Sequence, residues 1–221
     1  MTHDYLAERQ DVLDAVRRIV DADLVAISSG NVSRRIRTPE GDLFAVTASR
    51  VPYHRFGIDD VIVVDAAIEP VVGDGVPSSE SLAHMAVYHA RPDVGAVIHT
   101  HSVHASAFAA AGRPIPPILD EMVVAIGGAV EVAAYGASAS EQLADNAVAA
   151  LGDRAAVLLR NHGVIGVGAD LEEAVAVVEL VERVARIVIA AAAIGGAREL
   201  PADVVASEQR IYRMMKGFRE G

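Results

Sequence analysis

The chain has 221 residues, of which 52% are hydrophobic, 22% charged and only 4% aromatic. This length fits a single domain with a core of Ala, Val, Leu and Ile, and the composition excludes a disordered polyampholyte. The net charge of −11 disfavours a generic nucleic-acid binder, and the absence of cysteine excludes disulfides, iron–sulfur clusters, thiolate zinc sites and cysteine nucleophiles.

No segment of the sequence predicts secretion or insertion into a membrane. The first ten residues lack an apolar core and carry Asp4, Glu8 and Arg9, unlike a secretory signal. The longest apolar run, Ile187–Ile194, is too short to cross a bilayer. We therefore expect a cytoplasmic protein with neither a membrane nor a nucleic acid as partner.

The N-terminal half of the chain alternates between helix and strand patterns. Apolar residues first recur at three- and four-residue spacing, and later runs alternate apolar with charged side chains. A turn over residues 38–42 joins two of these runs into a hairpin. The segment Pro77-Ser78-Ser79-Glu80 predicts a helix entered through a serine cap. The predicted elements are a helix over 4–21, strands over 32–37, 43–47 and 61–65, and a helix over 82–89.

The C-terminal half continues this alternation. Ser138 or Ser140 is expected to cap one helix and Asp170 another, which Gly195-Gly196 should end. The predicted elements are a strand over 94–101, a helix over 102–111, a loop over 114–117, a helix to about 151, a strand over 155–159, a helix over 171–194 and a helical tail from 202 to 221. Without a linker or repeat, this pattern predicts one α/β domain over residues 1–221.

Two histidines on one predicted strand give the strongest chemical signal. Side chains of a strand alternate between faces, so His99 and His101 project from the same face and can share a metal ion. His162 ends another apolar run and is the third candidate ligand, as in a catalytic zinc-type site. The alternative is a pair of histidines on a solvated face. The apolar flanks favour ligation, because an unpartnered buried polar group is costly.

Two serine-containing segments are candidate anion sites. Ser78 and Ser79 precede a predicted helix, whose free amides and dipole attract anions, and Glu80 is a candidate general acid or base. The alternative is a plain helix cap followed by a favourable glutamate. The segment Ser28-Ser29-Gly30-Asn31 is likewise either an anion-binding loop or a turn.

Taken together, these segments resemble the class II aldolase/adducin family. The matching motifs occur in the family's order and spacing over about residues 5–215, and they are Ser29-Gly30-Asn31-Val32-Ser33, Pro77-Ser78-Ser79-Glu80, His99-Thr100-His101 and Asn161-His162-Gly163. The resemblance implies a three-layer α/β domain with helices on both faces of a central sheet. It also implies a homotetramer with active sites between subunits.

The resemblance implies a role for each matching residue. His99, His101 and His162 would hold one divalent cation per subunit, normally Zn²⁺, with Mn²⁺, Co²⁺ or Fe²⁺ as alternatives. Glu80 would transfer protons, and a glutamate here favours the family's aldolases over its epimerases, which have aspartate. The remaining matches would surround the phosphate of the substrate and are Gly30, Asn31, Ser49, Ser78 and Ser79.

The implied reaction is the cleavage of a small phosphorylated ketose, of the L-fuculose 1-phosphate or deoxyribulose 1-phosphate type, to dihydroxyacetone phosphate and an aldehyde. A divalent cation acts as a Lewis acid and stabilises the enediolate that this cleavage generates. The alternatives on the same scaffold are a dehydratase, a decarboxylase and a 4-epimerase. A non-catalytic, adducin-like binding module has no need of three convergent histidines and Glu80.

Two residues depart from the pattern of the family's aldolases. Arg50 stands where they usually have glycine, and it either contacts the phosphate, fills the pocket for a different anion, or points outward as a surface residue. Glu121 stands where they place a proton-donating tyrosine that reaches the neighbouring subunit's site. Glutamate here resembles the family's methylthioribulose-1-phosphate dehydratases, which lack the glutamate at position 80.

Three further residues carry weaker predictions. Tyr212 on the C-terminal helix matches a tail tyrosine that closes the aldolase site, or it simply packs the helix. His84 follows Glu80 by one helical turn, and His104 follows His101 by three residues. Each is either a support for the metal site or a histidine satisfied by nearby backbone.

Overall fold

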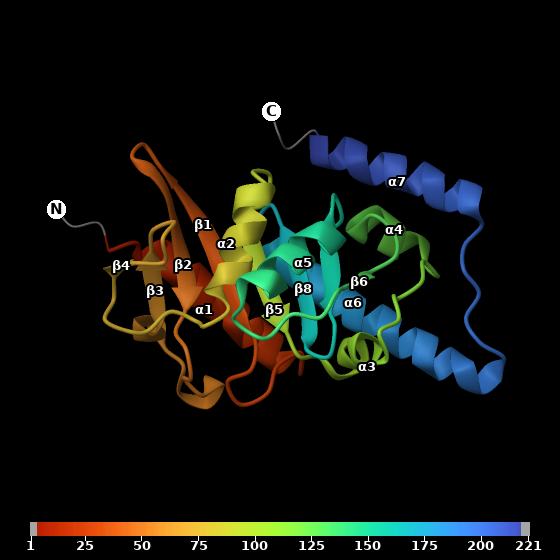
Figure 1. Cartoon of the computed structure of the whole chain (residues 1–221), viewed down its shortest axis with the longest axis horizontal. Coiled ribbons are helices and arrows are strands. Elements are labelled where there is room, and N and C mark those ends of the chain that lie inside the picture. Colours follow the sequence, from red (N-terminus) through yellow and green to blue (C-terminus); the bar gives the residue numbers. More distant parts are fainter. Residues whose placement is uncertain (1–3, 218–221) are drawn as a thin grey trace.

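The structure, a computed structural model, describes residues 4–217, and eight strands in this range form one sheet (Figure 1). The order is β4-β3-β2-β1-β5-β8-β7-β6, and every neighbouring pair is antiparallel except β6 and β7. The strands are β1 (Asn31–Thr38), β2 (Gly41–Thr47), β3 (Val61–Val64), β4 (Pro70–Val72), β5 (Ala96–Thr100), β6 (Glu131–Ala133), β7 (Ala156–Leu159) and β8 (Gly163–Gly168).

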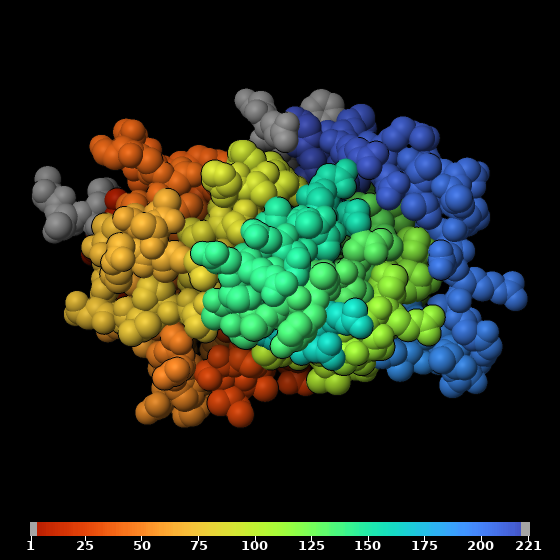
Figure 2. Space-filling view, in the orientation of Figure 1, coloured from red at the N-terminus to blue at the C-terminus, as the bar shows by residue number. Residues whose placement is uncertain are grey.

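Helices cover both faces of this sheet. Figure 1 shows α2 and α5 in front of it and α1 and α6 behind, and in Figure 2 the yellow and teal segments around α2 and α5 cover the near face. The helices are α1 (Leu6–Asp21), α2 (Ser81–Ala90), α3 (Val103–Ala111), α4 (Asp120–Ile126), α5 (Glu141–Leu151), α6 (Leu171–Ala191) and α7 (Ala202–Gly217). The predicted three-layer α/β fold is confirmed.

The central strand β5 contributes side chains to the buried clusters on both faces of the sheet. Ile98 packs into the cluster that contains residues of α1 and Val178 of α6, whereas Val97 packs into the cluster that contains Val87 of α2. This alternation is the period of two expected of a strand. Because His99 follows Ile98, its side chain lies on the same face as Val97, which is the face covered by α2.

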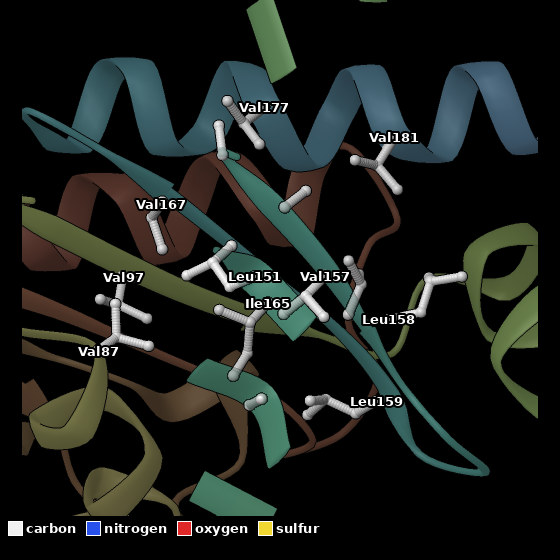
Figure 3. Close-up of a cluster of buried hydrophobic side chains, with 14 of the residues drawn as sticks. Val87, Val97, Leu151, Val157, Leu158, Leu159, Ile165, Val167, Val177 and Val181 are labelled. Atoms are coloured by element: carbon white, nitrogen blue, oxygen red, sulfur yellow. The ribbon is translucent and has the colours of Figure 1, made fainter. Parts of the chain in front are cut away.

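A large buried cluster of aliphatic side chains fixes the sheet and its helices. Figure 3 shows Val177 and Val181 projecting from α6, with Leu151, Val157 and Ile165 in the same cluster. All five are at most 2% exposed. Each fully buried aliphatic side chain contributes about 1.5–3 kcal/mol, so a core nearly without aromatic residues is sufficient to hold the strands in place.

The sequence predicted most elements with small errors at their ends. The N-terminal helix begins at Leu6, because Tyr5 adopts a left-handed conformation with φ of 50°. Ser140 caps α5 and Asp170 caps α6, as expected. The serine cap expected for α2 is wrong: Glu80 occupies the N-cap position and makes no side-chain cap hydrogen bond.

Four elements were not predicted, and they are α4, β4, β6 and β8. The last of these strands matters most, because β8 pairs with β5 and completes the centre of the sheet. At the C-terminus, α7 packs beside α4 at the margin of the molecule (Figure 1). The end of the predicted tail helix, residues 218–221, lies outside the described residues. Within residues 4–217, no helix combines the length and the apolar character needed to span a membrane.

Candidate active site

Four side chains converge at one end of the central strands. Glu80, His99, His101 and His162 each contribute one ligand-type atom, and these atoms all lie within 4.8 Å of one another. The Nε2 atoms of His99 and His101 are 2.9 Å apart. The two carboxylate oxygens of Glu80 lie 3.1 Å from Nε2 of His99 and of His162. We call these four residues the histidine centre.

Sheet topology explains why these residues meet. His99 lies near the end of β5, His101 directly follows that strand, and His162 lies in the turn between β7 and β8. Since β5 and β8 pair antiparallel, this turn lies beside the end of β5. Glu80 approaches on the α2 face, the face to which His99 points. The spacing argument for His99 and His101 therefore gave the correct geometry.

Gly163 allows the close approach of the two histidine segments. A Cβ atom at this position would lie 2.3 Å from the carbonyl oxygen of Thr100 and about 3 Å from the rings of His99 and His101. Any side chain here would therefore force the turn that carries His162 away from β5. The glycine after His162 is a requirement of the site.

The donor set fits a divalent cation. Nδ1 of His99 lies 3.0 Å from the carbonyl oxygen of Val164, and donation of its proton there leaves Nε2 as a lone pair facing the centre. Burial lowers the pKa of His99 to about 3 and also lowers the pKa of His101, so both rings are neutral near pH 7, as ligation requires. Three imidazoles match the three protein ligands of a zinc-type catalytic site, and the carboxylate lies beside them.

Two neutral donors hold the carboxylate of Glu80. Asn31 Nδ2 donates to Oε2 at 3.0 Å, and Ser138 Oγ donates to Oε1 at 2.9 Å. Burial alone would raise the pKa of Glu80, but the hydrogen bond to His162, the charge interaction with His99 and the bond from Ser138 hold it well below its usual range. The side chain is therefore ionised when no cation is bound.

Asn31 was predicted at the phosphate site, but its side chain is buried and contacts Glu80. β1 and β5 pair with Asn31 directly opposite His99, so both side chains lie on the α2 face. Ser138 was predicted only as a helix cap, and its contact with Glu80 was not foreseen. Ser140, two residues later, was an equally good candidate for this cap in the sequence, and it is the residue that caps α5.

A pocket of about 230 Å³ opens over the histidine centre. Besides Glu80, His101 and His162, it is lined by Ser28, Ser29, Gly30, Asn31, Ala48, Ser49, Arg50, Ser78, Ser79 and Ser138. The structure thus brings all the predicted phosphate-site residues to one pocket. We call Gly30, Ser49, Arg50, Ser78 and Ser79 the serine rim.

Arg50 is exposed and adopts φ of 62°, a left-handed conformation that glycine favours. The guanidinium makes no ion pair or hydrogen bond with another residue in the range 4–217, although Arg50 lines the pocket. The backbone thus keeps the shape that a glycine would provide. All three alternatives for its side chain stay predictions.

Glu121 and Tyr212 do not join the histidine centre within one chain. Glu121 is exposed on α4, and its carboxylate lies 3.1 Å from the guanidinium of Arg183 on α6. Tyr212 is 3% exposed and donates to the carbonyl oxygen of Asp153, and burial raises the pKa of Tyr212 to about 12. In this chain Tyr212 packs α7 against the body of the protein, which is the second of the two roles expected for it, and its role in closing the site stays a prediction.

Neither His84 nor His104 contacts the histidine centre. His84 is buried on α2, with Nδ1 2.7 Å from Ser33 Oγ, so it ties α2 to β1. His104 Nδ1 lies 2.6 Å from Glu182, whose carboxylate also accepts the backbone N–H groups of His104 and Ala105. Glu182 thereby secures the start of α3, just after His101.

Comparison with known proteins matches this geometry to one family. The family model described as Class II Aldolase and Adducin N-terminal domain matches residues 10–189. The chain is 32% identical over 196 residues to 5-deoxy-D-ribulose 1-phosphate aldolase of Bacillus thuringiensis, covering 89% of this chain and 91% of the relative. It is 33% identical to 5-methylthioribulose-1-phosphate/5-deoxyribulose-1-phosphate aldolase of Rhodospirillum rubrum, covering 96% and 93%. A solved structure of L-fuculose 1-phosphate aldolase superposes with a TM-score of 0.87 at 31% identity, covering 94% and 96%.

Proposed function

Because this chain is an enzyme of the class II aldolase and adducin family, we propose that it cleaves a small phosphorylated ketose to dihydroxyacetone phosphate and an aldehyde. The observation that carries this proposal is the histidine centre, in which the Glu80 carboxylate faces three imidazoles at the base of a polar pocket. The relatives named above as aldolases of 5-deoxyribulose 1-phosphate support a deoxyribulose-type substrate, and the solved structure supports an L-fuculose-type one.

The serine rim is the proposed phosphate site. Ser78 and Ser79 supply hydroxyls beside the start of α2, and Gly30 and Ser49 line the same pocket. Arg50 adds the guanidinium, which forms charge-assisted hydrogen bonds with phosphate oxygens. A phosphate bound there leaves the carbon chain of the ketose directed toward Glu80.

Glu80 is the proposed acid and base. It accepts the proton of the hydroxyl on the carbon that leaves as the aldehyde, while the carbon–carbon bond breaks and its electron pair passes toward the ketone oxygen. Glu80 then returns a proton to the carbon of the dihydroxyacetone phosphate half. His99, His101 and His162 would hold one divalent cation, for which we propose Zn²⁺, with Mn²⁺, Co²⁺ or Fe²⁺ as alternatives. When bound, it supplies Lewis-acid stabilisation of the developing negative charge.

The test of this function uses the purified full-length protein and a panel of ketose 1-phosphates, with products identified by mass. Dihydroxyacetone phosphate with an aldehyde is the expected result, together with about one divalent ion per chain. Loss of water would identify a dehydratase, the alternative that Glu121 favours. Loss of carbon dioxide would identify a decarboxylase, and a stereoisomer a 4-epimerase. Full activity in metal-free protein would contradict the mechanism.

We also propose a homotetramer in which Glu121 acts in a neighbouring subunit's pocket. Its exposed position, away from the histidine centre of its own chain, supports this arrangement. The expected result is that Glu80→Gln and Glu121→Gln, each inactive alone, regain activity when mixed and reassembled, because some pockets then contain both native carboxylates. Light scattering should give a tetramer. No recovery from mixed tetramers would place Glu121 outside the pocket.

We propose that residues 1–221 form a single domain, since the strands from β1 to β8 share one sheet. A phosphorylated sugar is charged and does not cross membranes unaided, which supports a cytoplasmic enzyme.

A further inference from the structure

Ser138 contacts Glu80 from a part of the chain that carries no other site residue. It lies in the turn between β6 and α5 and is exposed at the wall of the pocket. Its Oγ donates to Glu80 Oε1 at 2.9 Å, across 58 residues of sequence. Glu80 has no cap partner of its own at the start of α2, so its carboxylate depends on such tertiary contacts for its position.

The two oxygens of Glu80 are held from opposite sides. Asn31 on β1 donates to Oε2, which also faces His99, and Ser138 donates to Oε1, which also faces His162. Rotation of the carboxylate about its last torsion breaks both hydrogen bonds. A hydrogen bond to a charged acceptor is stronger and more directional than one between neutral groups. The pair of donors therefore defines one orientation of the carboxylate.

The turn that carries Ser138 is itself anchored. Ser140 Oγ donates to the carbonyl oxygen of Ala137 at 2.6 Å and accepts the N–H of Leu143. Asn146 Nδ2 contacts the carbonyl oxygens at the start of the turn. Ala139, directly after Ser138, adopts φ of 61°, a conformation that an alanine holds only when its surroundings impose it.

We propose that Ser138 is a positioning residue, which fixes the Glu80 carboxylate against the three histidines while it transfers protons. Its hydroxyl touches Glu80 and lines the pocket, and the anchored turn keeps it in place. The kinetic part of this inference rests on the proposed function. A merely structural role is assigned instead to Ser140, which caps α5 two residues later and does not touch Glu80.

The test compares Ser138→Ala, Ser138→Thr and Ser140→Ala in the full-length, metal-loaded protein. Loss of a hydrogen bond to a charged group predicts a fall of about tenfold in kcat for Ser138→Ala, with KM and melting temperature unchanged. Ser138→Thr keeps the hydroxyl and should keep most of the activity. Ser140→Ala removes the cap of α5 and the hydrogen bond to the Ala137 carbonyl, so it should lower the melting temperature, but it should lower kcat less than Ser138→Ala because Ser140 does not touch Glu80.

A second readout does not depend on the reaction. Protein loaded with Co²⁺ gives a visible absorption spectrum that reports the groups around the ion, among them the Glu80 carboxylate beside the three histidines. Ser138→Ala should change the spectrum more than Ser140→Ala does. A wild-type kcat and a wild-type Co²⁺ spectrum in Ser138→Ala would overturn the inference, as would equal losses of kcat in both alanine variants. If the wild-type protein turns over no ketose phosphate, the proposed function fails, and the Co²⁺ comparison alone decides the role of Ser138.

Discussion

The histidine centre and the serine rim share one pocket but are built differently. In the centre, His99 and Glu80 are at most 8% exposed, and the four residues lie at or directly beside the ends of α2, β5 and β8. In the rim, Arg50 and Ser79 are exposed, and the residues come from loops between elements. The centre is fixed by core packing, whereas the rim follows loop conformation.

This difference separates the proposed chemistry from the proposed binding of the phosphate. A change in the centre disturbs side chains that touch one another and the core, so few substitutions are tolerated. A change at Arg50 or Ser79 of the rim alters an exposed loop with little effect on packing, whereas Gly30 lies against β5, where a Cβ would come within 2.6 Å of the carbonyl oxygen of His99. Differences among family members in how the phosphate is held are therefore expected to map to the rim, and Arg50 is the position where this chain departs from the glycine of the family's aldolases.

The largest expected effect is in the centre. Glu80→Gln should lower kcat by about a thousandfold, because general acid–base catalysis contributes 10²–10⁴ in rate. The amide is nearly the same size, so the variant should fold and should keep its metal, as measured by elemental analysis. A variant that loses its metal, or one that keeps wild-type turnover, would break the assignment of proton transfer to this carboxylate.

A second effect concerns the pH dependence of stability and comes from His84, which is buried on α2. Burial lowers the pKa of His84 to about 4, below the value of about 6.5 in an unfolded chain. Between these values only the unfolded state binds the proton, so acid removes stability as pH falls from 6.5 to 4. Urea unfolding at pH 7 and pH 5 should show a loss of about 2 kcal/mol from this group. His84→Gln should be less stable at pH 7 and have a shallower pH dependence, and an unchanged slope would contradict the shift.

The smallest effect is expected at the rim. Arg50→Gly should raise KM for a phosphorylated ketose about tenfold, the value of one charge-assisted contact, and leave kcat nearly unchanged. It should also relieve the left-handed backbone and stabilise the fold by up to about 1 kcal/mol. Added salt should weaken substrate binding by the native enzyme more than by the variant. An unchanged KM would show that Arg50 is a surface residue that takes no part in anion binding.

The fold and the centre were largely predictable because they depend on periodicity and on unusual residues. Strand spacing placed His99 and His101 on one face, and the motif order identified His162 and Glu80. The strand β8 was missed because Gly163, Gly166 and Gly168 interrupt its apolar pattern. Space explains all three: a Cβ at Gly163 would meet the carbonyl oxygen of Thr100, and a Cβ at Gly166 or Gly168 would lie 2.5 Å from Val178 or from the backbone nitrogen of Ala174 on α6.

Contacts between distant loops were not predictable from local pattern. Ser138 and Ser140 look alike in sequence, yet one caps α5 and the other holds Glu80, because only the folded turn determines which hydroxyl faces the pocket. The partner of Asn31 likewise depends on the pairing of β1 with β5. For Tyr212, the resemblance suggested the pocket, but the packing of α7 placed its hydroxyl on Asp153.

The position of His162 in the turn before β8 has a consequence for biosynthesis. The N-terminal part of the chain contains Glu80, His99 and His101, but the third imidazole reaches them only when β8 pairs with β5. A nascent chain on the ribosome therefore lacks a complete ligand set until that strand has emerged, and α6 must then follow to cover it. Loading of the proposed cation is therefore expected only after the central sheet has formed.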